Sequence, residues 1–464
     1  MTAARSGPQR VGIVGMGHVG LVTGLAFAAR GLSVVGYDVQ PSVRAAVSRG
    51  RPPFHEPGLR DLLRRELRSG RFHVVGSLDD LVAAAEAVFL CVPTPSRREG
   101  AIDLRPLRQC ARDVGASLQR RTGFRLIVVK STVVPGTAEK IVAPIVRRSA
   151  GRTLGFAVAS NPEFLAEGSM VRDALHPERV VIGTSDARAL RWLRRAYRPF
   201  GAPIFCVAPS TAELIKYASN SFLALKVSFA NEVARVADRL GVDVDTALEA
   251  VGHDPRIGGR FLRAGPGFGG SCFDKDLRAF LAWSSGEGLR FRSGETALRV
   301  NDEQLEYALG LIRDAAGPLG GKEVALLGLS FKAGTEDVRE SRAMLLARGL
   351  TRSGARVRVH DPVALGNFRR EWERQGSRAP TRVRFCRTVT EALTGADVAV
   401  LQADWPQYLR WPSAWTRRMH RPLLVDLRRA VPRSVAHRAG LTVVGLGSGT
   451  FNSQRSAAPD QEPK

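Results

Sequence analysis

The first forty residues carry a hydrophobic pattern that predicts a strand, a helix and a second strand. The apolar run VGIVG at 11–15 precedes a glycine turn, an alanine-rich stretch and the apolar run LSVVGYD at 32–38. This order is that of a βαβ unit, whose strands lie side by side in a parallel sheet. Two more apolar runs, EAVFLCVPTP at 86–95 and FRLIVVKSTVVPGT at 124–137, predict strands that end in loops rich in Pro, Gly and Thr.

A long helix is predicted at 211–240, TAELIKYASNSFLALKVSFANEVARVADRL, because apolar residues recur there at helical spacing. They occupy more than one face of the helix. We therefore expect this helix to be buried between domains or in a dimer.

The last third of the chain repeats the outline of the first. The runs KEVALLGLSF at 322–331, RVRVHDP at 356–362 and GADVAVLQAD at 395–404 predict a second α/β domain. No glycine fingerprint follows Gly328, so this domain is expected to bind something other than a dinucleotide. The predicted fold class is α/β, with two Rossmann-like doubly wound domains joined by a central helical domain. The polar segment 446–464 is predicted to be disordered.

The composition adds limits to this picture. With 464 residues, the chain has room for about three domains. Five cysteines show neither a CxxC pattern nor metal-ligand spacing, which favours free thiols in the cytoplasm and no metal site. The start of the chain has no apolar signal-peptide core. The glycines, the His and the Arg within 11–36 also argue against a membrane-spanning helix.

The formal net charge of +25 raises the possibility of a nucleic-acid or other polyanion partner. Of the 69 basic residues only eight are Lys, and many Arg lie singly on predicted helix surfaces, which favours a solvated basic surface. Lys is compact and its pKa shifts readily, so a rare Lys is a candidate for chemistry that Arg does not perform. Four of the eight fall within motifs: Lys130, Lys216, Lys275 and Lys332.

The turn after the first strand is a nucleotide-binding candidate. Its glycines, Gly15, Gly17 and Gly20, follow the GxGxxG spacing, which allows a tight bend and close approach to a pyrophosphate. Asp38 follows at the distance expected for a carboxylate that binds a ribose 2'-hydroxyl. A carboxylate repels a 2'-phosphate, so NAD is predicted rather than NADP. The strand-end residues Thr94, Ser131 and Thr132 should face the same cofactor.

Two pairs of polar residues are candidates for catalysis, one pair on the predicted long helix and the other in a loop after a predicted strand. Lys216 and Asn220 lie one helical turn apart in an otherwise apolar stretch, which favours a functional pair over a surface pair. Glu163 and Glu167, in SNPEFLAEG at 160–168, are equally compatible with a loop cap and with a site.

Cys272 follows four glycines in GPGFGGSCFDKD at 265–276. A free Cys is most often a small buried apolar residue. Here the glycines should leave backbone exposed to a ligand, and a helix beginning after Cys272, with Lys275 nearby, favours a thiolate nucleophile. A thiolate captures an aldehyde as a thiohemiacetal, which is oxidised to a thioester and hydrolysed to an acid. One site then performs two oxidations.

Seven motifs together resemble the UDP-glucose/GDP-mannose dehydrogenase family, in family order from about 11 to 410. They are GMGHVG, CVPTP, KSTVVPGT, NPEFLAEG, ELIKYASNSFLALKVSFANE, RIGGRFLRAGPGFGGSCFDKD and LGLSFKAGTEDVRES. The resemblance implies an NAD-binding Rossmann domain at 1–205, a central dimerisation domain at 206–305 and a UDP-sugar-binding α/β domain at 306–445. It implies NAD-dependent, four-electron oxidation of UDP-glucose to UDP-glucuronate by a cytoplasmic homodimer.

The resemblance also implies the roles of individual residues. For catalysis it implies the nucleophile Cys272, the oxyanion-stabilising Lys216 with Asn220, and Asp276, Glu163 and Thr132 around the hydrolytic water. For NAD it implies Gly15, Gly17, Val19, Gly20, Asp38, Thr94, Ser131, Glu167 and Arg339. For the sugar nucleotide it implies Phe164, Leu165, Lys216, Asn220, Arg263, Phe268, Gly269, Phe331, Lys332 and, from a neighbouring subunit, Arg256.

Three positions depart from the family pattern. Asp274 stands where Pro is usual, which adds a negative charge near the nucleophile and is expected to raise the pKa of the thiol. Gly259 also replaces a common Pro, which loosens the loop after Arg256. Leu409 stands directly after the aromatic residue Tyr408, where a basic residue is often found, and the basic residue Arg410 comes one place later.

Other functions remain open on the sequence. The same chemistry on GDP-mannose or on a UDP-N-acetylhexosamine needs the same motifs. A two-electron hydroxyacid dehydrogenase of the 6-phosphogluconate type also uses Lys and Asn on a helix but needs no Cys272. A catalytically inactive polyanion binder with this fold would account for the net charge but would not explain the set of candidate catalytic residues.

Overall fold

A computed structural model describes residues 9–97, 99–151, 155–376, 382–447 and 450–451. The chain folds into two compact units. Unit 1 comprises Met1–Ser219 and Arg278–Leu289, and unit 2 comprises Asn220–Leu277 and Arg290–Lys464. Residues of the predicted central domain, 206–305, are thus distributed over both units.

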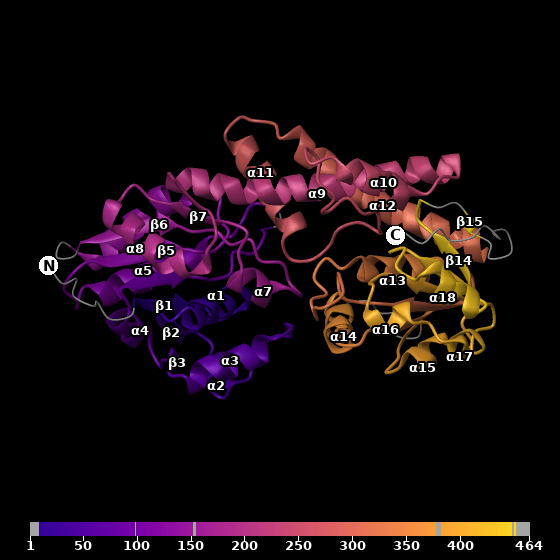
Figure 1. The fold of residues 1–464 in the computed structure, drawn as a ribbon, viewed down its shortest axis with the longest axis horizontal. Helices are drawn as coiled ribbons and strands as arrows, with labels where there is room; N and C mark the ends of the chain where they lie inside the picture. Colours follow the sequence, from indigo (N-terminus) through magenta and orange to yellow (C-terminus); the bar gives the residue numbers. More distant parts are fainter. Residues whose placement is uncertain (1–8, 98, 152–154, 377–381, 448–449, 452–464) are drawn as a thin grey trace. The chain divides into compact units, whose positions relative to one another are not determined.

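Unit 1 contains an eight-stranded sheet in the order β3-β2-β1-β4-β5-β6-β7-β8. Its strands and connecting helices are coloured indigo to magenta in Figure 1. Neighbouring strands are parallel except β6 and β7, which are antiparallel. Central strands such as β4 are buried throughout, as expected for a parallel sheet covered on both faces. The strands are β1 Arg10–Val14, β2 Ser33–Tyr37, β3 Phe72–Val74, β4 Ala87–Leu90, β5 Arg125–Val129, β6 Phe156–Ser160, β7 Val180–Gly183 and β8 Ile204–Val207.

Helices connect the strands of unit 1 and cover its sheet. Helix α1 contacts α3 and α7, whereas α4, α5 and α6 form a second set of contacts. The helices are α1 His18–Ala29, α2 Pro41–Ser48, α3 Leu59–Arg68, α4 Leu78–Ala84, α5 Arg105–Leu118, α6 Ala143–Ala150, α7 Met170–Leu175 and α8 Ala187–Tyr197, with short turns η1 Ala138–Val142 and η2 Arg198–Phe200. Helices α9 Pro209–Leu240 and α11 Phe273–Gly286 contribute residues to both units.

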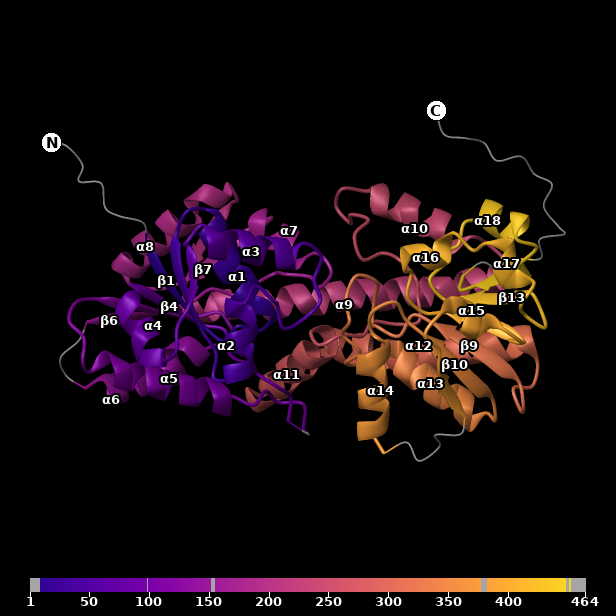
Figure 2. The ribbon, with the colours of Figure 1, turned by 90° about the horizontal axis from the view of Figure 1, so that it is seen from below.

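Unit 2 contains a seven-stranded sheet in the order β11-β10-β9-β12-β13-β14-β15. Helices α12 and α13 contact each other, and α13 lies against β10 (Figure 2). The strands are β9 Glu323–Leu327, β10 Arg356–His360, β11 Val383–Phe385, β12 Val398–Leu401, β13 Leu423–Asp426, β14 Thr442–Gly445 and β15 Thr450–Phe451. The helices are α10 Val244–His253, α12 Arg292–Ala316, α13 Arg342–Arg352, α14 Leu365–Arg374, α15 Val389–Leu393, α16 Pro406–Leu409, α17 Ser413–Thr416 and α18 Arg433–Arg438.

The predicted repeat and fold class are confirmed. In unit 2, β9 lies between β10 and β12, as β1 lies between β2 and β4 in unit 1. The predicted long helix is also present, as α9.

The prediction of disorder from residue 446 is wrong at its start. Leu446 is fully buried in the core of unit 2. Thr450 and Phe451 form β15, which pairs antiparallel with β14. Polar neighbours in the sequence concealed this short edge strand, because a two-residue strand leaves no periodic pattern. Residues 448–449 and 452–464 lie outside the described residues.

Candidate active site

The glycine turn joins β1 to α1 under tight steric limits. Gly15 has a φ of +92°, and a Cβ there would lie 2.6 Å from the carbonyl oxygen of Cys91. A Cβ at Gly20 would lie 1.8 Å from the carbonyl oxygen of Gly15. The fold itself therefore requires both glycines.

Gly17 is different, because none of the described atoms lies within 4 Å of a Cβ built there. It is the N-cap of α1 and makes no side-chain capping bond. An open glycine at a helix N-terminus is the geometry that accepts a pyrophosphate, since backbone N–H groups and the helix dipole favour an anion. Val19 lies half-buried in the first turn of α1. The turn thus fits NAD.

Asp38 follows β2 and lies beside this turn. One carboxylate oxygen accepts from the Met16 N–H at 2.8 Å and the other from the Gln40 N–H at 2.9 Å. The side chain is half-buried. Each oxygen retains a further lone pair, so the carboxylate can also accept from ribose hydroxyls, as the NAD prediction requires.

Thr94, Ser131 and Thr132 come together where β4 and β5 end. The Thr94 hydroxyl donates to the Thr132 carbonyl at 2.9 Å, and the Ser131 hydroxyl donates to the Val92 carbonyl at 2.6 Å. Both hydroxyl protons are thus committed to the backbone. Toward a cofactor these two oxygens act as acceptors, and their main structural effect is to hold the two loops together.

Glu163 and Lys216 form a buried ion pair in unit 1, with Lys216 Nζ 2.8 Å from Glu163 Oε1. Glu163 Oε2 accepts from the Leu165 N–H at 2.6 Å. Burial opposes ionisation of Glu163, but Lys216 and the backbone bond outweigh it and hold the carboxyl pKa below its ordinary value. Glu163 is therefore an anion at neutral pH, not a proton donor.

The loop that carries Glu163 has further fixed contacts. Two cations lie near the Phe164 ring, with the Arg179 guanidinium carbon 3.9 Å and Lys216 Nζ 5.6 Å from its centroid. Buried Glu56, which the sequence reasoning missed, accepts from the N–H groups of Gly168 and Met170, both at 2.8 Å. A lone acid in HEPGL gives no periodic signal that could have identified it. Glu167 lies half-buried on the same loop.

In unit 2, Cys272 directly precedes α11, as predicted, and its carbonyl accepts from the Asp276 N–H at 2.8 Å. Its Sγ lies 3.7 Å from the Ser271 hydroxyl oxygen. A sulfur at a helix N-terminus lies where the helix dipole favours a thiolate. Asp274 shares the first turn of α11 with Asp276, so its charge opposes part of this effect.

Asp276 is the buried centre of a small polar cluster. One carboxylate oxygen accepts from Asn220 Nδ2 at 2.7 Å and the other from Lys275 Nζ at 2.5 Å. The side chain is almost completely buried. The structure thus brings together three predicted residues, Asn220, Asp276 and Lys275, one helical turn beyond Cys272.

The glycine loop at 265–270 differs from expectation. Its backbone is mostly buried by unit 2 itself, and Gly269 is the part left half-exposed. A Cβ at Gly269 would lie 2.3 Å from the Glu340 carbonyl oxygen, and one at Gly270 would lie 2.8 Å from the Phe331 ring. The glycines therefore allow close packing within the protein, whereas the sequence reasoning attributed them to ligand access.

Buried amides and an arginine hold this loop, and the sequence reasoning missed them. The Phe268 N–H donates to Asn301 Oδ1 at 2.7 Å, and Arg342 Nε donates to the Phe268 carbonyl at 2.9 Å. The Gly265 N–H donates to Asn231 Oδ1 at 2.8 Å. These residues lie 33 to 74 positions from their partners, so no local motif reveals them.

The remaining predicted residues of unit 2 occupy several places. Phe331 and Lys332 are half-buried after β9, with Lys332 Nζ 5.5 Å from the Phe331 ring centroid. Arg339 forms a two-pronged ion pair with Asp337, with bonds of 2.9 and 2.6 Å. It lies in unit 2, whereas the other NAD candidates belong to unit 1, so its role remains a prediction.

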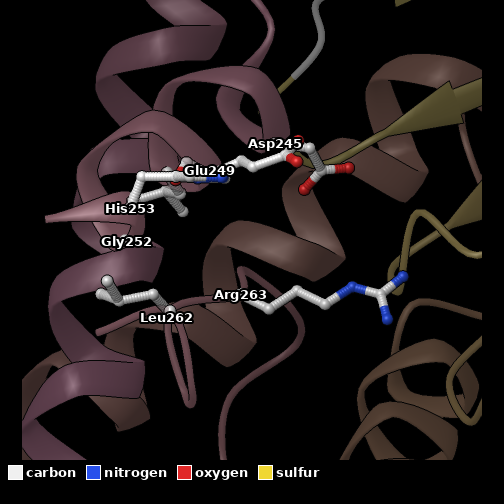
Figure 3. Close-up of a pocket in the computed structure, with 8 residues that line it drawn as sticks. Asp245, Glu249, Gly252, His253, Leu262 and Arg263 are labelled. Atoms are coloured by element: carbon white, nitrogen blue, oxygen red, sulfur yellow. The ribbon is translucent and has the colours of Figure 1, made fainter. Parts of the chain in front are cut away.

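A cavity of about 570 Å³ lies between α10 and the loop at 259–263 (Figure 3). Figure 3 shows Asp245 and Glu249 on the helix and Leu262 and Arg263 on the loop. Arg263 donates to the carbonyls of Arg428 and Arg429 at 3.0 and 3.2 Å. Exposed Arg256 pairs with Asp254.

Comparison with known proteins matches three consecutive family models. They are the NAD binding, central and UDP binding domains of the UDP-glucose/GDP-mannose dehydrogenase family, at residues 9–201, 210–303 and 325–433. The chain is 38% identical over 432 residues to UDP-glucose 6-dehydrogenase AglM of Haloferax volcanii, covering 92% of this chain and 98% of the relative.

Solved structures give the same result. A UDP-glucose dehydrogenase from Pyrobaculum islandicum is 42% identical, with a TM-score of 0.86 and coverage of 93% of this chain and 96% of the other. A UDP-D-ManNAc dehydrogenase from Pyrococcus horikoshii is 28% identical, with a TM-score of 0.81 and coverage of 95% and 100%.

Fold, glycine turn and family matches together define an NAD-dependent nucleotide-sugar dehydrogenase. The chain belongs to the UDP-glucose/GDP-mannose dehydrogenase family. The sequence-based family assignment and the NAD prediction are confirmed. Within the described residues, every helix is too short or too polar to cross a membrane.

The two kinds of glycine predict different mutant behaviour. Gly20→Ala forces a Cβ against the Gly15 carbonyl and should lower the free energy of unfolding by about 3 kcal/mol. Gly17→Ala meets open space, so its stability should stay within about 1 kcal/mol of the unmutated protein, while NAD affinity falls about tenfold or more. Denaturant unfolding and calorimetric NAD titration measure the two effects. Unchanged NAD affinity in Gly17→Ala would contradict the pyrophosphate assignment.

Proposed function

We propose that this protein oxidises UDP-glucose to UDP-glucuronate in two successive NAD-dependent steps. The observation that carries the proposal is the start of α11. There Cys272 stands at a helix N-terminus and Asp276, one turn later, is held by Asn220 and Lys275. A two-electron alcohol dehydrogenase needs no such cysteine, whereas a thiolate that captures the aldehyde allows a second oxidation at the same carbon.

The chemistry follows from the thiolate. The C6 alcohol of the sugar is first oxidised to an aldehyde, and the Cys272 sulfur adds to its carbonyl carbon to form a thiohemiacetal. A second oxidation converts this adduct to a thioester, and water then releases the acid and restores the thiol. NAD, when bound, accepts one hydride in each oxidation.

The other roles are proposed residue by residue. Lys216 supplies a positive charge for the oxyanions that form at C6, and Glu163 keeps its ammonium in place. Asp276, fixed by Asn220, supports the attack of water on the thioester. Thr132, half-buried at the end of β5, is proposed to orient the same water with Glu163.

UDP-glucose is preferred over other nucleotide sugars on the basis of the relatives. Identity is 42% to the UDP-glucose dehydrogenase structure and 28% to the UDP-D-ManNAc dehydrogenase structure. The candidate substrate contacts are Phe164, Leu165, Lys216, Asn220, Arg256, Arg263, Phe268, Gly269, Phe331 and Lys332. GDP-mannose and UDP-N-acetylhexosamines are the alternative substrates to be assayed.

We propose a homodimer that uses the exposed face of α9. Phe222, Phe229 and Val236 are 60, 50 and 58% exposed and recur every seven residues, so they form one apolar stripe. A stripe of this kind on a long helix suits a second copy of the same helix. A cytoplasmic location is also proposed, because all five cysteines are free thiols.

The stoichiometry of the reaction tests the main proposal. With NAD in excess, complete turnover should yield two NADH per UDP-glucose, measured by absorbance against the nucleotide sugars resolved by chromatography. One NADH per sugar, with aldehyde released, would overturn the role of Cys272. No NADH with UDP-glucose, but turnover of another nucleotide sugar, would overturn the choice of substrate.

Cys272→Ser should lower acid production by about a thousandfold or more, because a serine hydroxyl is not ionised near neutral pH and forms no thioester. NAD affinity should be unchanged. Mass spectrometry of the products and calorimetric NAD titration provide the measurements. Cys206→Ser serves as a control, since Cys206 is an exposed free thiol on β8, outside the candidate site. Sustained acid formation by Cys272→Ser would defeat the covalent mechanism.

Light scattering tests the dimer. The unmutated protein should have twice the chain mass of 50.2 kDa, and the double variant Phe222→Asp/Phe229→Asp should be monomeric, because two charges interrupt the apolar stripe. Leu289→Asp, at a residue 63% exposed in unit 1, is the matched control and should remain dimeric. A monomeric unmutated protein would contradict the proposal.

A further inference from the structure

Lys130 is a buried lysine to which the proposed reaction gives no role. It directly follows β5 and is 6% exposed. Burying an ammonium is costly unless each of its three N–H groups finds an acceptor. Lys130 Nζ donates to Asn161 Oδ1 at 3.0 Å, to the Pro162 carbonyl at 3.4 Å and to the Tyr197 hydroxyl at 3.4 Å. All three acceptors are neutral.

These acceptors connect Lys130 to the residue pair that the reaction needs. Asn161 and Pro162 immediately precede Glu163, and Glu163 holds Lys216. Asn161 itself is fixed, because its N–H donates to the Val129 carbonyl at 2.9 Å and its Nδ2 donates to the Val181 carbonyl at 2.7 Å. The Tyr197 hydroxyl donates to Asn161 Oδ1 at 2.5 Å. The ammonium therefore anchors the turn from which Glu163 projects.

The titratable groups that face Lys130 come from four elements. They are Cys91 after β4, Glu163 after β6, Tyr197 at the end of α8 and Lys216 on α9. Burial raises the pKa of Cys91 to about 12 and also raises the pKa of Tyr197 well above its ordinary value, so both groups stay protonated near neutral pH. Glu163 stays ionised. Near neutral pH, the cluster thus holds one anion, Glu163, and two lysines that interact with it electrostatically.

Burial lowers the pKa of Lys130 to about 8, with the charge of Lys216 acting in the same direction and the Glu163 carboxylate opposing. In return, the Lys130 charge helps to keep Glu163 ionised. The ammonium form exists below this pKa and is lost as pH rises through it. Loss of the proton removes one of three N–H donors and the charge that faces Glu163.

We propose that Lys130 is a positioning residue that holds Asn161 and Pro162 and thereby orients Glu163 against Lys216. It acts in its ammonium form and touches neither substrate nor NAD. The inference rests on the proposed roles of Glu163 and Lys216. It predicts that kcat for UDP-glucose oxidation depends on the protonation of a group remote from the reacting carbon.

The central experiment compares pH profiles of kcat and KM for the unmutated protein, Lys130→Met and Tyr197→Phe. In Lys130→Met, kcat should fall by about a hundredfold, the cost of displacing a reacting group by about 1 Å, with KM for NAD unchanged. The alkaline fall of kcat near pH 8 in the unmutated protein should be absent. Lys140→Met removes an exposed lysine of the same unit and should match the unmutated protein throughout.

Tyr197→Phe keeps the test independent of whether Lys130→Met folds. This variant removes one acceptor, which destabilises the ammonium and lowers the pKa of Lys130. The alkaline fall of kcat should therefore move to lower pH, a change that a merely structural role would not produce. An unshifted profile in folded Tyr197→Phe, or full kcat in Lys130→Met, would overturn the inference. No NADH from the unmutated protein would instead overturn the proposed function.

Discussion

The buried ion pair between Lys216 and Glu163 holds two candidate catalytic residues of unit 1 in place. It joins the loop after β6 to the first turns of α9 across 53 residues of sequence. Removing one partner of such a pair leaves an unpaired buried charge, at a cost of about 3–5 kcal/mol. Glu213, on the same helix, adds a second anchor by accepting from the N–H groups of Gly136 and Ala138 at 2.6 and 2.9 Å. The start of α9 is thereby fixed to the loops at the carboxyl ends of the strands.

The two α/β domains share a topology but use the acid at the end of their second strand in different ways. Asp38 is half-buried and accepts from two backbone N–H groups, so it retains room for a ribose. Asp361 is buried. It accepts from the backbone N–H groups of Leu329, Ser330, Val363 and Ala364 and from the Trp405 indole N–H. The lone pairs of the Asp361 carboxylate are therefore occupied by hydrogen bonds within its own domain. The absence of a glycine fingerprint after β9 accords with this arrangement, and the family model that matches residues 325–433 is that of a UDP binding domain.

The surroundings of Cys272 differ in part from the reasons for which the sequence pointed to it. The sequence pointed to this cysteine because glycines precede it and a helix follows. The helix begins at Phe273, in agreement. The glycines, however, make room for the Glu340 carbonyl and the Phe331 ring. Close packing of 265–270 against the segment after β9 fixes the backbone that leads to Cys272. These glycines therefore help to position Cys272.

Local features of this protein were readable from the sequence, because they depend on residues close together in the chain. The strand and helix patterns, the GxGxxG turn, the position of Cys272 before a helix and the one-turn spacing of Lys216 and Asn220 are of this kind. Partners such as Glu163 with Lys216, Lys130 with Tyr197 and Phe268 with Arg342 lie 53 to 74 residues apart. No periodicity tells which buried carboxylate, hydroxyl or carbonyl a lysine or arginine will meet. That choice was made only when the sheets and helices packed, because a buried charge must find its acceptors among the groups that packing brings near.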